Sequence, residues 1–73
     1  MQSNKLNRFS RQVSDSYYVM YINGHWIHFN YDVEIDRWIV FSRTLPLNSE
    51  HMNLNKAKKK TRIKLNEMKI LWE

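Results

Sequence analysis

Residues 17–33 decide the fold and read YYVMYINGHWIHFNYDV. Asn23-Gly24 at the centre is typical of a type I′ turn, because both central residues of that turn adopt a positive φ. Residues 17–22 before the turn and residues 25–33 after it are rich in aromatic and β-branched side chains, which favour strands. The stretch therefore predicts a β-hairpin.

The two-residue turn sets the register of this hairpin, and the register sorts its side chains between two faces. The expected opposite pairs are Ile22 with His25, Met20 with Ile27, and Tyr18 with Phe29. The first face then carries Tyr18, Met20, Ile27, Phe29, Tyr31 and Val33. The opposite face carries Tyr17, Val19, Tyr21, Trp26 and His28. Both faces are unusually apolar.

A third strand is expected after a turn within residues 34–37, and Pro46 ends it because proline cannot donate to a strand ladder. If the loop has an even number of residues, Val33 pairs with Trp38. The first face then gains Trp38 and Val40, and the second gains Ile39, Phe41 and Arg43. A loop with an odd number of residues would exchange the two sets.

The segment after Pro46 has two interpretations. In the first, Asn48 or Ser49 caps a helix, and good helix formers place apolar residues at spacings of three and four. That helix face consists of Leu54, Ala57, Thr61, Leu65, Met68 and Trp72. In the second, residues 61–65 and 68–72 are strands around an Asn66-Glu67 turn. We favour the helix, and the predicted fold is α+β: a three-stranded antiparallel β-meander with a C-terminal helix and a flexible basic N-terminal tail.

Residues 1–15 are predicted to be that tail, and residues 16–73 are predicted to be a single small α+β domain. The larger apolar residues of the tail, Leu6, Phe9 and Val13, are too few to stabilise an isolated helix. The alternative is an arm that becomes helical on a partner, with Arg8 and Arg11 on anionic groups.

Positive charge is concentrated in the C-terminal segment. The chain has 12 Lys and Arg against 7 Asp and Glu, a net charge of +5. A cluster of cations within residues 56–64 consists of Lys56, Lys58, Lys59, Lys60, Arg62 and Lys64. Together with Arg8 and Arg11, these residues are predicted to bind nucleic-acid phosphates or an acidic protein surface. The alternative is a solvated face that only confers solubility.

The second face of the sheet is predicted to bind a protein partner. Three strands and one covering segment cannot bury two apolar faces, and Tyr and Trp are typical anchors of interfaces. The residues predicted for this surface are Tyr17, Tyr21, Trp26, His28, Phe41 and Arg43. The alternative is that these aromatic residues belong to a core. Either a monomer or a homodimer is consistent with the pattern.

Composition argues against several classes of protein. The absence of Cys excludes disulfides, thiolate zinc sites and cysteine nucleophiles. His25 and His28 are three residues apart, which places them on opposite faces of a strand, so no metal site is predicted. Gly24 is the only glycine, so a Gly-rich phosphate loop cannot form. We predict no enzyme activity and no cofactor, because a core this small supplies only roughly 3–5 kcal/mol.

No membrane contact is expected, because no stretch approaches the length of about 18 apolar residues that spans a bilayer. Residues 1–10 lack the apolar core of a secretory signal, so the expected location is cytoplasmic.

Three short segments resemble the strands of chromo and chromo-barrel domains. They are residues 17–21 (YYVMY), residues 36–39 (DRWI) and residues 42–45 (SRTL). The stretch between the first two is longer here than the compact turn of that family. The resemblance implies a small β-sheet module followed by a helix, with an aromatic cage that reads methylated lysine.

The expected function is binding and regulation. A short, basic, cysteine-free chain rich in Asn and Lys is similar in composition to early proteins of tailed bacteriophages. That similarity implies a non-enzymatic regulator that binds host transcription or nucleic-acid machinery, such as RNA polymerase, in the host cytoplasm. One alternative is a protein that binds single-stranded nucleic acid directly, with sheet aromatics stacking on bases and the lysines holding phosphates. The other is a chromo-like reader.

Overall fold

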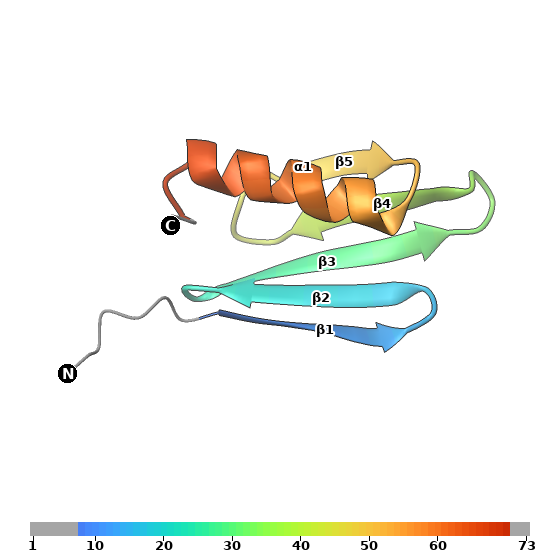
Figure 1. Cartoon of the computed structure of the whole chain (residues 1–73), viewed down its shortest axis with the longest axis horizontal. Helices are drawn as coiled ribbons and strands as arrows, with labels where there is room; N and C mark the ends of the chain where they lie inside the picture. Colours follow the sequence, from blue (N-terminus) through green and yellow to red (C-terminus); the bar gives the residue numbers. More distant parts are fainter. Residues whose placement is uncertain (1–7, 71–73) are drawn as a thin grey trace.

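The computed structural model describes residues 8–70, which form a five-stranded antiparallel sheet and one helix. Each strand pairs with its neighbour in the sequence, so the sheet order is β1-β2-β3-β4-β5 (Figure 1). The elements are β1 (Arg8–Ser14), β2 (Tyr17–Ile22), β3 (His25–Asp32), β4 (Arg37–Ser42), β5 (Asn48–His51) and α1 (Leu54–Glu67). The prediction of three strands is therefore wrong, although the α+β class is correct.

The β2–β3 hairpin forms as predicted. Asn23 and Gly24 adopt φ values of 48° and 90°, the left-handed region that the Asn-Gly turn requires. Ile22 lies opposite His25, Met20 opposite Ile27, and Tyr18 opposite Phe29. The turn chemistry alone was sufficient to give this register.

The turn between β3 and β4 lies slightly earlier than expected. Tyr31 pairs with Trp38 and Asp32 pairs with Arg37, so the loop is residues 33–36 and Val33 does not pair with Trp38. Val33 is 76% exposed at the tip instead. The loop is of even length, so the predicted assignment of β4 side chains to the two faces is correct. The Tyr31 hydroxyl donates a hydrogen bond to Asp36, and this bond is the main cause that raises the pKa of Tyr31.

Residues 8–14 are a strand, and the prediction that they belong to a flexible tail is wrong for this part. They pair with β2 along their whole length, with an irregularity between Gln12 and Ser14. All seven residues of β1 are exposed, because β1 is an edge strand that no helix covers. Its polar composition resembles a tail because an edge strand is held by backbone hydrogen bonds and needs no apolar stripe. Residues 1–7 lie outside the described part of the chain.

The segment after Pro46 forms a fifth strand before the helix begins. Asn48–His51 pairs with β4, so neither Asn48 nor Ser49 caps the helix. Leu47 is buried and its carbonyl accepts a hydrogen bond from the Ser42 amide, which turns the chain back along β4. The sequence NSEH carries no strand periodicity, and pairing with β4 decides its conformation.

The helix begins after Asn53, whose side chain accepts a hydrogen bond of 2.9 Å from the Lys56 amide. It continues through residues 61–67, so the alternative of a hairpin there is wrong. Its predicted apolar face is confirmed as far as residue 68, since Ala57, Thr61 and Leu65 are buried and Leu54 and Met68 pack against the core. Trp72 lies outside the described part of the chain.

The core lies between α1 and the side of the sheet that the sequence assigned to the first face. Its buried members are Ile22, Ile27, Phe29, Val40, Leu47, Ala57 and Leu65. The helix contacts β4 and β5 and lies away from β1, as Figure 1 shows. Two regions of the sheet therefore remain uncovered: the whole opposite side, and the helix side of the β1–β2 hairpin. Within residues 8–70, α1 is too short and too polar to cross a bilayer.

Candidate binding surfaces

The side of the sheet that faces away from α1 carries a set of partly exposed aromatic rings, and we call it the open face. Strand pairing places Phe9, Tyr21 and Trp26 in one row across β1, β2 and β3. It places His28 beside Phe41, with Tyr17 at the neighbouring position of β2. Phe9, Trp26 and Phe41 are 45%, 47% and 43% exposed. These values exceed what a core position would show.

The first row forms a contiguous cluster of rings. The Tyr21 and Trp26 ring centroids are 4.8 Å apart, and Phe9 meets Trp26 edge to face at 6.1 Å. Such pairs hold the rings in fixed orientations and contribute about 0.5–1.5 kcal/mol each. Because Tyr21 and Trp26 are in direct contact, a methylammonium ion has no space between them. The cluster is an apolar platform of inclined rings and does not resemble the cage of a chromo domain.

The second cluster adds a polar group to the platform. The Tyr17 hydroxyl lies 2.8 Å from His28 Nδ1, and the two rings stack with centroids 6.0 Å apart. Phe41 stacks on the other side of His28 at 6.5 Å. Val19 is buried between the two clusters although no helix covers it. The rings therefore shelter the sheet and leave their outer surfaces in water.

Five of the six residues predicted for the protein-binding surface come together on the open face. They are Tyr17, Tyr21, Trp26, His28 and Phe41. Arg43 lies in the loop that follows β4. Phe9 and Arg11 also lie on this face, opposite Tyr21 and Val19, and the sequence reasoning missed Phe9 because it treated β1 as a tail. The alternation of Phe9 and Arg11 with polar residues was the available signal.

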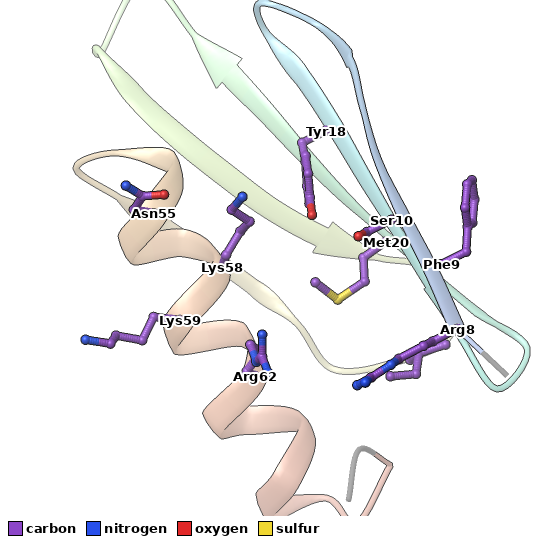
Figure 2. A pocket seen from close by; sticks show the side chains of 10 residues that line it. Arg8, Phe9, Ser10, Tyr18, Met20, Asn55, Lys58, Lys59 and Arg62 are labelled. Carbon is purple, nitrogen blue, oxygen red and sulfur yellow. The ribbon is translucent and has the colours of Figure 1, made fainter. Parts of the chain in front are cut away.

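A groove separates α1 from the β1–β2 hairpin on the other side of the sheet, and we call it the basic groove. It has a volume of about 810 Å³. Its lining includes Arg8, Ser10, Tyr18, Met20, Asn55, Lys58, Lys59 and Arg62. Figure 2 shows that Lys58 projects from α1 toward Tyr18 of β2, whereas Lys59 points outward from the helix. Arg8 lies at the opposite wall.

The electrostatics of the basic groove are one-sided. Among the lining residues that the structure describes, four are cations and none is a carboxylate. Lys58 Nζ lies 4.6 Å from the centroid of the Tyr18 ring, in cation–π contact, and Tyr18 meets the buried Phe29 edge to face. The groove thus combines a partly exposed flat ring with concentrated positive charge.

The predicted cationic cluster is divided between two sides of α1. Lys58, Lys59 and Arg62 line the basic groove. Lys60 and Lys64 line a smaller depression of about 370 Å³ against β5. Lys56 lies exposed in the first turn of α1, and Arg11 lies on the open face. These cations therefore lie on separate surfaces, and the lysines of α1 lie on the side of the sheet opposite to the open-face rings.

A hydroxyl–imidazole pair lies in the smaller depression. Ser49 Oγ is 2.8 Å from His51 Nε2. Among residues 8–70 no carboxylate hydrogen-bonds to His51, so the pair lacks the third group that orients a catalytic triad. Burial, and then the charge of Lys60, lower the pKa of His51. No cluster of three or more His, Asp or Glu within the described residues is placed to hold a metal ion.

We predict that Lys60→Gln raises the pKa of His51 toward its ordinary value of 6.5, because the neighbouring cation disfavours protonation. The folded state binds this proton less readily than the unfolded state. Neutral His51 therefore contributes its full share of the stability above about pH 6.5. This contribution is lost as the pH falls through the lowered pKa of His51 in the folded state. An NMR titration of the imidazole measures the shift, with Lys59→Gln on the other side of α1 as control. An unchanged His51 titration in Lys60→Gln would contradict the assigned cause.

No family model, no curated protein and no solved structure matches this chain.

Proposed function

We propose that this chain is a small non-enzymatic regulatory protein that acts by docking its open face onto a protein of the transcription or nucleic-acid machinery. The observation that carries the proposal is the platform formed by Phe9, Trp26 and Phe41, each more than 40% exposed. Three large rings on one uncovered sheet face exceed the scattered apolar residues of an ordinary monomer surface.

The charge distribution supports a partner within nucleic-acid machinery. Proteins that handle nucleic acid expose acidic surfaces or carry bound polyanions, and a chain with a net charge of +5 is steered toward both. The open face carries Arg11 beside its rings, while α1 carries the larger positive field on the opposite side. Aromatic contacts would provide affinity, and the cations would accelerate the encounter.

RNA polymerase is the specific partner that we propose, in a bacterial host of which this chain would be a phage-encoded regulator. Composition supports this choice, and the geometry supports only the existence of a protein-binding face. The contact between Tyr21 and Trp26 leaves no cation-sized space between their rings, which disfavours the chromo-like alternative.

The proposal predicts that purified bacterial RNA polymerase binds the immobilised chain and that Trp26→Ala weakens this binding. A central Trp of an interface contributes about 2 kcal/mol or more, so the dissociation constant should rise about 30-fold. Biolayer interferometry measures this change. The matched control is Val33→Ala, which removes an exposed apolar side chain of the β3–β4 turn.

The outcomes separate the parts of the proposal. If nuclease-treated lysate yields a different protein that depends on Trp26, the open face is a docking surface and the choice of polymerase is wrong. A homodimer that Trp26→Ala dissociates, detected by light scattering, would mean that a second copy covers the face. Retention of no protein by the wild-type chain would overturn the proposed function.

A further inference from the structure

We propose that the basic groove binds single-stranded nucleic acid, with a base stacked on Tyr18 and the phosphates held by Arg8, Lys58 and Arg62. This site lies on the side of the sheet opposite to the open face. It therefore adds a second binding function to the proposed one and does not depend on it.

Charge complementarity is the first argument. Four cations from two elements line the groove: Arg8 from β1, and Lys58, Lys59 and Arg62 from α1. Among residues 8–70, the lining of the groove includes no carboxylate. Figure 2 shows Arg8 on one wall and Lys58 on the other, and an anionic chain can lie between them, whereas Lys59 is directed to water.

The shape of the groove is the second argument. Its volume of about 810 Å³ lies within the range of sites that hold compact ligands. A few nucleotides of a single strand are compact ligands of this kind.

The nature of the floor is the third argument. Tyr18 presents a ring, Met20 a polarisable thioether, and Asn55 an amide that can hydrogen-bond to a base edge. The Lys58 ammonium now lies over the Tyr18 ring at 4.6 Å. A base that stacks on this ring takes the place of the ammonium, which then pairs with a phosphate. An acidic peptide supplies the negative charge without the flat rings that use this floor.

Fluorescence anisotropy with a short labelled oligothymidylate tests the proposal. We expect binding at about 50 mM salt with a log–log salt slope near −2, from the three cations Arg8, Lys58 and Arg62 at about −0.7 per phosphate contact. Lys58→Glu with Arg62→Glu should weaken binding at least about tenfold and reduce the slope toward −1. The matched control is Lys60→Glu with Lys64→Glu, which makes the same change in net charge on the other side of α1 and should weaken binding less than about threefold.

Two further variants keep the test independent of folding and of the proposed function. Tyr18→Leu retains apolar packing against Phe29 and removes the stacking surface, so we expect at least about fivefold weaker binding with an unchanged circular dichroism spectrum. Trp26→Ala lies on the open face and should bind the oligonucleotide as the wild type does, whatever its effect on a protein partner.

Three results would overturn the proposal. The first is the absence of oligonucleotide binding at about 50 mM salt. The second is equal loss in the two double variants, which would mean diffuse attraction by the whole helix. The third is displacement of the oligonucleotide by polyglutamate of the same charge at equal concentration, which would assign the groove to an acidic protein.

Discussion

Phe29→Ala is expected to leave the chain largely unfolded at room temperature. Phe29 is fully buried at the centre of the sheet, where it contacts the Tyr18 ring and packs beneath α1. Removing a buried phenyl ring costs about 3–5 kcal/mol, because the neighbours cannot close the cavity. A domain of this size has a total stability of roughly 3–5 kcal/mol. Circular dichroism with urea titration measures the loss.

Phe41→Ala is the matched control, since it removes the same side chain from the adjacent strand on the open face. Phe41 is already partly in water and its main contact is the stack on His28, so we expect a cost of about 1 kcal/mol and a folded protein. Similar destabilisation by the two variants would mean that the open face is part of a core, which would also remove the basis of the proposed function.

Leu65→Ala is expected to give the second-largest loss and to act on the attachment of α1. Leu65 is fully buried and follows Ala57 and Thr61 on the helix stripe that faces the sheet. Truncation of a buried leucine costs about 2–5 kcal/mol. An isolated helix of 14 residues is marginal in water, so loss of this anchor should melt α1 together with the core.

Ile63→Ala provides the comparison on the same helix. Ile63 is 50% exposed, and alanine is the better helix former, so the free energy of unfolding should change by less than about 0.5 kcal/mol. Thermal denaturation, followed by the circular dichroism of the helix, compares Ile63→Ala with Leu65→Ala. A loss in Ile63→Ala as large as that in Leu65→Ala would show that the contact face of α1 is assigned wrongly.

The residues that the sequence alone could place are those whose conformation is decided locally. Asn23-Gly24 specifies its turn through the positive φ of both residues, and the alternation of side chains then assigns every position of β2 and β3 to a face. The helix face could be predicted because Ala57, Thr61 and Leu65 recur at helical spacing.

The two edge strands could not be predicted because pairing with a neighbour decides their conformation. β1 is exposed along its whole length, and its alternation of Phe9 and Arg11 with polar residues is too weak to distinguish a strand from a tail. β5 reads Asn-Ser-Glu-His and shows no apolar alternation. Missing β1 had a direct effect on the candidate sites. Phe9 could not be added to the open face, and Arg8 could not be placed across the groove from Lys58.

The order of the strands also bears on how quickly the chain reaches its native state. Every strand lies beside the strand that precedes it in the sequence, and the turns between them are short. No pairing has to wait for distant segments to meet, so the entropy cost of closing each loop is small. A topology with such local connections is associated with rapid folding. A newly made copy would therefore spend little time with its aromatic residues on unpaired strands.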